Sequence, residues 1–156
     1  YGMPFDAVRN GISSFTGIQR RFQKLGTYKG ALVVDDYAHH PDELRATLLT
    51  ARSLGYNKIV CCFQPHTYSR TKAFLNEFID VLKLADVAVL TDIYSARETN
   101  VYGISSRDIA KGVPGAIYAG SLEESAGVLG KYADDGVLIL TCGAGTVNKV
   151  AKMLLK

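Results

Sequence analysis

Short runs of apolar residues, each followed by a polar loop and a helical pattern, recur along the chain. The run Ala31–Val34 contains only small or branched apolar residues, which is typical of a strand buried on both faces. Later runs have the same character, and they cover Lys58–Phe63, Asp86–Leu90, Ala116–Ala119 and Gly136–Thr141. Between these runs, apolar residues recur at the three- and four-residue spacing of helices. The pattern therefore predicts strands that alternate with helices.

This alternation predicts an α/β fold, a Rossmann-like three-layer sandwich with a mostly parallel sheet of about six strands and helices on both faces. The segment Gly17–Lys29 adds an edge strand or hairpin arm, with Phe22 and Leu25 as its buried side chains. Crossover connections place the loops that follow parallel strands at one edge of the sheet, where ligands bind in folds of this class. We therefore expect one shared rim, formed by the loops after Val34, Phe63, Leu90 and Thr141.

Several helix starts are indicated by capping residues. Pro41 suits the first turn of a helix, and the acidic pair that follows it complements the helix dipole. Ser121 is followed three residues later by Glu124, the spacing of a capping box. Ser105 or Ser106 is the N-cap of a short helix that ends at Lys111. One longer helix is predicted over Lys72–Leu84.

The N-terminal segment has a different character from the rest of the chain. Pro4–Phe15 has one apolar face and little else to cover it, with Phe5, Val8, Ile12 and Phe15 at helical spacing. Thr16-Gly17 then interrupts the pattern. This helix could be the first element of the main domain, but we favour residues 1–16 as the end of a preceding domain. The main domain is then 17–156.

Composition excludes several classes of function. The 18 basic and 15 acidic residues give a net charge of only +3, and no stripe of basic and aromatic residues appears, so no nucleic-acid partner is expected. Three cysteines lie in apolar runs and are read as buried thiols of a reducing compartment. No apolar stretch approaches the ~20 residues of a membrane span, and no signal-peptide pattern is present. A cytoplasmic location without a membrane partner is expected.

The strand Ala31–Val34 ends in Asp-Asp-Tyr-Ala-His-His, so two carboxylates and two imidazoles lie within six positions, 35–40. At the ligand edge of a sheet, this cluster favours a functional site over a capped turn. A metal site is not predicted, because adjacent loop residues diverge and His66 is the only other histidine. His66 and Arg70 flank a second polar loop of the rim, and arginine suits bidentate recognition of carboxylate or phosphate.

Glycine-rich phosphate-binding loops are poorly represented. No Walker A sequence occurs in the chain. The turn Gly143–Gly145 precedes a helix and could bind an anion through its N–H groups, or it could simply be a tight turn.

Four motifs, taken together and in order, resemble the C-terminal domain of the Mur ligases. They are RRF at Arg20–Phe22, DDYAHHP at Asp35–Pro41, FQPHTYSRT at Phe63–Thr71 and GAGTVNK at Gly143–Lys149. The resemblance extends from about Ile12 to the end of the chain. It implies an ATP-dependent ligase of peptidoglycan synthesis with three domains, in which the central domain carries the P-loop. Residues 1–16 would then be the tail of that central ATPase domain and its hinge. ATP and Mg²⁺ would be held mainly by that central domain, and this domain would pack against the central and N-terminal domains of its own full-length chain.

For the reaction, the resemblance implies that ATP converts the carboxylate of UDP-N-acetylmuramate into an acyl phosphate. The amine of L-alanine would then attack it, which gives an amide, ADP and phosphate. Positioning and stabilisation of negative charge would account for the catalysis. The fragment alone would have no ligase activity.

The resemblance also implies roles for single residues. Arg21, rather than Arg20, would reach the phosphates of ATP, and Asp36, with Asp35 beside it, would lie on the ribose side. The other site residues would face the amino acid and the muramoyl carboxylate. They are His39 and Arg70 as catalytic residues, and His40, His66, Gly145 and Asn148, together with Arg70, as substrate-binding residues.

Three alternatives stay open. A related ligase that attaches a whole tripeptide to the UDP-sugar shares the DDYAHHP type of motif, although its counterpart of the His66–Arg70 loop differs. A metal-dependent phosphoesterase could use an Asp/His cluster, but it would need more ligands than His66 and Asp92 supply. A receiver-like module could use Asp92 as phosphoacceptor, but no lysine follows the last strand at Thr141.

Overall fold

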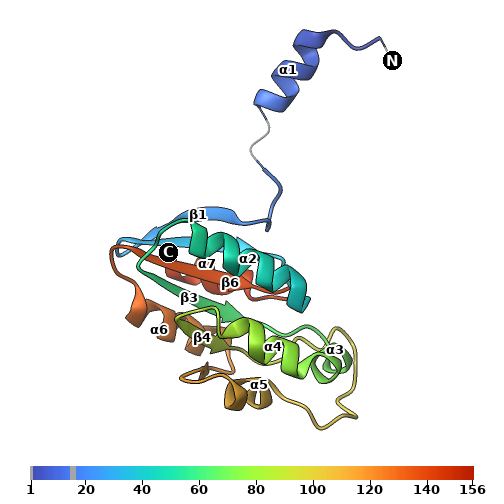
Figure 1. The fold of residues 1–156 in the computed structure, drawn as a ribbon, viewed down its shortest axis with the longest axis vertical. Coiled ribbons are helices and arrows are strands. Elements are labelled where there is room, and N and C mark those ends of the chain that lie inside the picture. The colour runs from blue at the N-terminus through green and yellow to red at the C-terminus, as the bar shows by residue number, and fades with distance from the viewer. Residues whose placement is uncertain (1, 15–16) are drawn as a thin grey trace.

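The computed structural model describes residues 2–14 and 17–156, and its centre is a six-stranded sheet with the order β1-β2-β6-β3-β4-β5 (Figure 1). All neighbouring strands are parallel except β1, which pairs antiparallel with β2. This architecture confirms the predicted α/β class and the mostly parallel sheet. The strands are β1 (Gln23–Tyr28), β2 (Ala31–Asp36), β3 (Lys58–Phe63), β4 (Val87–Leu90), β5 (Ile117–Tyr118) and β6 (Val137–Cys142).

Helices cover both faces of the sheet, so the three-layer arrangement is also confirmed (Figure 1). Side chains of α2, α4 and α5 pack on one face, and side chains of α6 and α7 pack on the other. The short helix α3 lies between β3 and α4 in the chain. The helices after the first are α2 (Pro41–Ser53), α3 (Tyr68–Ala73), α4 (Leu75–Leu82), α5 (Ser106–Gly112), α6 (Leu122–Tyr132) and α7 (Asn148–Leu154).

The core consists of two apolar layers, one on each face of the sheet. Alternate residues of a strand enter different layers, so Val34 packs with α2 while Val33 packs with α7. Strand β6 lies between β2 and β3, and all six of its residues are buried. The three cysteines are free and buried, as predicted. No described helix is both long and apolar enough to cross a bilayer.

The ends of the central strands lie level with one another. Asp36 is the partner of Cys142, and Cys142 is also the partner of Phe63. The loops after β2, β3, β4 and β6 therefore start at the same edge, and the predicted shared rim is confirmed. Strand β2 is longer than predicted, because it continues through Asp35 and Asp36.

Helix α1 (Phe5–Ser13) stands apart from the three layers (Figure 1). None of its residues is buried, and Phe5 is 77% exposed. Phe15 and Thr16, which belong to the predicted apolar face and hinge, lie outside the described residues. The assignment of residues 1–16 to a preceding domain stays a prediction.

The predicted helix over Lys72–Leu84 is wrong in its bounds. Helical structure begins earlier, because Thr67 caps α3 by accepting a hydrogen bond on Oγ1 from the backbone N–H of Arg70 at 3.3 Å. The helix then breaks at Phe74, whose φ of −114° and ψ of 28° are not helical. The capping boxes at Ser105 and Ser121 are present.

Candidate functional site

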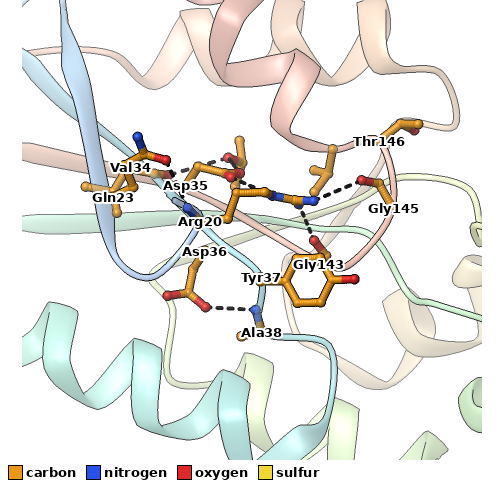
Figure 2. A network of polar contacts seen from close by, with 12 residues as sticks. Arg20, Gln23, Val34, Asp35, Asp36, Tyr37, Ala38, Gly143, Gly145 and Thr146 are labelled. Atoms are coloured by element: carbon orange, nitrogen blue, oxygen red, sulfur yellow. Dashed lines mark hydrogen bonds and ion pairs between the residues drawn. The ribbon is translucent and has the colours of Figure 1, made fainter. Parts of the chain in front are cut away.

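The two carboxylates at the end of β2 point to opposite faces of the sheet (Figure 2). Asp35 is 1% exposed, and its oxygens accept hydrogen bonds from Oγ1 of Thr141 at 2.6 Å and from Nε of Arg20 at 2.9 Å. Burial raises the pKa of Asp35 above its ordinary value, and the bonds from Thr141 and Arg20 oppose that rise. This carboxylate therefore depends on its two partners to stay charged.

Asp36 holds the backbone on both sides of the rim. Its Oδ2 accepts a hydrogen bond from the N–H of Phe22 at 2.6 Å, and its Oδ1 accepts one from the N–H of Ala38 at 2.8 Å. It is 5% exposed. Both predicted nucleotide-binding carboxylates thus bind their own chain in this structure, and a role toward the ribose stays a prediction.

The adjacent arginines Arg20 and Arg21 have opposite environments. The guanidinium of Arg20 donates to Asp35 and to the backbone carbonyl oxygens of Gly143 and Gly145, the last at 3.3 Å (Figure 2). Its side chain is only 19% exposed. Arg21 is exposed instead. A role of Arg21 toward the phosphates of ATP stays a prediction, and the structure gives Arg20 contacts inside the protein that the sequence did not indicate.

Arg21 lines a hollow of about 530 Å³ at the start of the main domain. The hollow is formed by Gly17, Ile18, Gln19, Arg21, Phe22, Gln23 and Lys24. Two cations and two amides in one hollow are suitable donors for an anionic ligand.

The rim brings three predicted residues from two loops together. The rings of His39 and His66 lie with their centroids 5.7 Å apart. Nη1 of Arg70 donates to Nδ1 of His66 at 3.3 Å, which requires the tautomer with hydrogen on Nε2. Nδ1 of His39 lies 3.0 Å from the carbonyl oxygen of Tyr37 and 3.3 Å from Oε2 of Glu43. These contacts give both imidazoles fixed orientations.

His40 points away from that pair. Its ring packs edge-on against Phe74 at 4.7 Å, and its Nδ1 accepts a hydrogen bond from the N–H of Asp42 at 3.3 Å. Glu43 accepts hydrogen bonds from the backbone N–H groups of His39 and His40. Although partial burial raises the pKa of Glu43, these bonds and nearby positive charge hold it below its ordinary value. His40 therefore caps α2, and a substrate-binding role for it stays a prediction.

The GAG turn, Gly143–Gly145, is held from both sides. Gln64 is 5% exposed, and its Oε1 accepts hydrogen bonds from the N–H groups of Thr146 at 2.7 Å and Val147 at 3.0 Å. A Cβ at Gly145 would lie 2.5 Å from that oxygen, so the turn requires glycine there. Because those N–H groups already have an acceptor, the structure favours the tight-turn interpretation over a phosphate-binding turn.

Asn148 is the first residue of α7. It lines a smaller hollow of about 190 Å³ on the α7 side of the sheet. That hollow is formed by Gln19, Arg20, Gln23, Leu25, Asp35, Asn148 and Lys152. His66 and Arg70 are not among the residues that line this hollow, and a substrate-binding role for Asn148 stays a prediction.

Glu98 and Tyr94, in the loop after β4, also contact the site. Glu98 accepts hydrogen bonds from the N–H of Ser69 at 2.9 Å and from its hydroxyl at 2.5 Å, which ties the loop after β4 to α3. The ring of Tyr94 stacks on His66 with centroids 5.6 Å apart. The hydrophobic pattern cannot show such contacts, since they join loops far apart in sequence.

Within residues 2–14 and 17–156, no group of three or more His, Cys, Asp or Glu side chains is arranged to hold a metal ion. The side chains Asp35, Asp36, His39 and His40, which offered such ligands in the sequence, instead point in different directions.

The Rossmann-like sheet thus carries a hollow lined by cations and a rim with paired histidines and an arginine. The family model described as "Mur ligase, glutamate ligase domain" matches residues 20–145. The chain therefore belongs to the Mur ligase family, and its fold is that of the C-terminal domain of these enzymes.

Curated relatives make the family assignment more specific. A protein of Agathobacter rectalis named UDP-N-acetylmuramate–L-alanine ligase is 51% identical over 160 residues, which cover 99% of this chain and 35% of that protein. A protein of the same name from Acetivibrio thermocellus is 46% identical and is covered to 34%. The chain is thus a C-terminal domain of the type found in these ligases, and it spans about a third of their length.

Solved structures agree with this result. The UDP-N-acetylmuramate-alanine ligase MurC of Thermotoga maritima matches 99% of this chain with 33% of its own, with a TM-score of 0.76 and 27% identity. A bifunctional folylpolyglutamate synthase/dihydrofolate synthase of Yersinia pestis, complexed with AMPPNP and Mn ion, matches with a TM-score of 0.73. It is 18% identical over 99% of this chain and 35% of its own, and it shares the fold.

Proposed function

We propose that this chain is the C-terminal domain of an ATP-dependent, cytoplasmic ligase that joins L-alanine to UDP-N-acetylmuramate. The support comes from relatives that carry this name at 40% to 51% identity over nearly the whole chain. Because the chain spans only about a third of those relatives, the activity belongs to a longer protein. The domain alone is expected to be inactive, and in the full-length chain it would pack against a central and an N-terminal domain.

The observation that supports this function best is the grouping of His39, His66 and Arg70 at the rim. A guanidinium has five N–H donors, so the contact with His66 leaves donors for a carboxylate. Arg70 would bind the carboxylate of the amino acid or the muramoyl carboxylate, and neutral His66 would present its Nε2–H beside it.

His39 would act on the amine. With Nδ1 facing the Tyr37 carbonyl and the Glu43 carboxylate, its hydrogen lies on Nδ1, and Nε2 carries the lone pair. That nitrogen would accept the proton that the amino group of L-alanine must lose when it attacks an acyl phosphate. Glu43 would stabilise the imidazolium that results.

The hollow around Arg21 would bind the phosphates of ATP. Phosphate oxygens are recognised by guanidinium, ammonium and amide donors, and Arg21, Lys24, Gln19 and Gln23 supply these. The charge of Arg21 would stabilise the negative charge of the phosphate chain. A Mg²⁺ ion, when bound, neutralises phosphate charge in such transfers. As the family resemblance implies, the central domain of the full-length protein would hold it.

The test uses the full-length parent enzyme, with ADP release measured in the presence of UDP-N-acetylmuramate, ATP and Mg²⁺. We expect turnover that depends on L-alanine. Arg70→Gln should lower kcat/KM for L-alanine by about 10²–10³-fold, the usual loss for one charged donor that acts in the transition state. Arg45→Gln, at an exposed position on α2, is the matched control and should keep wild-type rates.

Other outcomes would contradict the proposal in distinct ways. Turnover with a tripeptide but not with L-alanine would identify the peptide-adding type of ligase. An absence of ADP release with either acceptor, from a folded full-length protein, would remove the ligase assignment. Equal losses in Arg70→Gln and Arg45→Gln would show that Arg70 does not bind substrate.

A further inference from the structure

Arg20 makes polar contacts with several separate parts of the chain. Its guanidinium bonds the buried carboxylate of Asp35 and the carbonyl oxygens of Gly143 and Gly145, so it joins β2 to the loop after β6 (Figure 2). Its backbone N–H donates to Oε1 of Gln23 at 2.9 Å. Both its side chain and its backbone are therefore engaged.

The same residue also contacts the loop that carries the histidines. The carbonyl oxygen of Arg20 accepts a hydrogen bond from the N–H of Tyr37 at 2.7 Å, and its guanidinium lies 4.9 Å from the centre of the Tyr37 ring. The Tyr37 ring in turn packs edge-on against His39 at 5.4 Å. Arg20 thus contacts both the GAG turn and the Tyr37–His39 loop of the rim, and it directly precedes Arg21, which lines the hollow.

The GAG turn is clamped between Arg20 and Gln64. Arg20 occupies its carbonyl oxygens, while Gln64 occupies the N–H groups of the residues that follow it. If Arg20 left, a buried carboxylate and two carbonyl oxygens would lose their partner, which is costly in a protected site. These contacts therefore restrain the GAG turn and the backbone at Arg20 relative to each other.

We propose that Arg20 is a positioning residue that couples the segment 17–24, which faces the nucleotide, to the rim formed by the GAG turn and His39, which faces the amino acid. This inference rests on the proposed function for the identity of the two ligands. When a ligand orders either the segment 17–24 or the rim, the contacts of Arg20 also order the other one. The two ligands therefore raise each other's affinity by the same factor.

The proposal separates the two adjacent arginines. Arg21 touches the nucleotide, and its loss should weaken nucleotide binding directly. Arg20 touches no ligand, and its loss should weaken the dependence of one ligand on the other. The left-handed backbone at Arg20, with a φ of 58°, is what turns its side chain into the protein while its neighbour stays exposed.

The experiment uses the full-length parent enzyme with Arg20→Lys and Arg20→Gln. The matched controls are Arg52→Lys and Arg52→Gln, because Arg52 also pairs with a carboxylate, on Asp86, and donates to a carbonyl, on Leu84. Two quantities are measured: amide hydrogen exchange of peptides that cover 143–149, and the factor by which L-alanine changes the affinity for the non-hydrolysable nucleotide AMPPNP in equilibrium titrations.

We expect faster exchange in 143–149 for both Arg20 variants, and a coupling factor that falls from a wild-type value of about 5–150 toward one. Arg20→Lys keeps the charge beside Asp35 and so tests the geometry even if Arg20→Gln fails to fold. The Arg52 variants should leave both quantities unchanged.

Three results would overturn the proposal: unchanged exchange in 143–149, an unchanged coupling factor, or equal effects in the Arg52 variants. Weaker nucleotide binding with unchanged coupling would make Arg20 a direct phosphate ligand instead. Hydrogen exchange does not require turnover. The contacts that hold the GAG turn can therefore be confirmed even in an enzyme that fails the L-alanine assay. The two proposals can thus fail separately.

Discussion

Partial burial and a neighbouring cation both affect the pKa of His66. Burial lowers its pKa below the ordinary value, the charges of Arg70 and His39 lower it further, and Glu98 acts in the opposite direction. The imidazole is therefore neutral at neutral pH. As the pH falls below about 6.5, the unfolded chain binds this proton first, so the free energy of unfolding decreases until the lowered pKa is passed.

We expect the pKa of His66 to rise toward its ordinary value in Arg70→Gln, because one source of positive charge is removed. The change can be followed as the shift of the imidazole Cε1 proton resonance in an NMR titration. Arg45→Gln, at an exposed position on α2, should leave this titration unchanged. A pKa of His66 that stays the same in Arg70→Gln would show that the Arg70–His66 contact is absent in solution.

Two glycines offer a matched pair of substitutions to alanine. At Gly145 the new Cβ would lie 2.5 Å from Oε1 of Gln64 and 2.6 Å from Cγ of Tyr94, so Gly145→Ala should lower the free energy of unfolding by about 1–3 kcal/mol. At Gly127, in α6, nothing lies within 4 Å of the Cβ position. Gly127→Ala should therefore raise the free energy of unfolding by about 0.5–1 kcal/mol. Urea denaturation measures both, and a neutral Gly145→Ala would mean that the turn is looser than described.

For single residues, the sequence predicted which loops contain the polar side chains of the site, but not which contacts those side chains make. It placed Asp35, His66 and Arg70 on one rim, because strand ends can be located from apolar runs. It could not show that Arg20 turns inward, since that depends on a left-handed backbone and on carbonyl groups more than 120 residues away in sequence. Periodicity does not register such contacts.

At the level of the elements, α7 depends on a residue outside the helix for the hydrogen bonds at its start. The backbone N–H groups just before it bond Gln64, and Val147 at its N-cap makes no side-chain capping bond. Helix starts need such acceptors, and valine cannot supply one.

Gln64→Ala should thus lower the free energy of unfolding by about 1–2 kcal/mol, because two N–H groups lose their acceptor. Gln64→Glu keeps an acceptor oxygen and should cost less. The midpoint of urea denaturation for the two variants gives the comparison. If both variants lose the same amount, the effect comes from packing rather than from the hydrogen bonds.

Element types were predicted better than element bounds. The apolar runs located β3, β4 and β6 to within one residue at each end, since buried strands need continuous apolar sequence. The break at Phe74 was missed, because Phe74 fits the apolar helical spacing of 72–84 and its ring packs on His40 from another loop. Tertiary packing here overrides the local pattern.

At the level of the whole molecule, α1 contributes no buried surface to the sheet layers. Deletion of residues 1–16 should therefore leave the melting temperature of 17–156 within about 2 °C of that of the full 156-residue chain. Calorimetry on both forms measures this. A larger drop would show that the segment packs on the main domain and would contradict the boundary at residue 17.

The position of β6 in the sheet has a consequence for the order of synthesis. This strand is the last of the sheet to be made, yet it lies between β2 and β3, which begin 106 and 79 residues earlier in the chain. Until Val137–Cys142 is available, the earlier strands have no partner between them and present two unpaired edges. The nascent domain therefore completes its sheet only after Val137–Cys142 has left the ribosome, and until then its unpaired edges are open to chaperones or to aggregation.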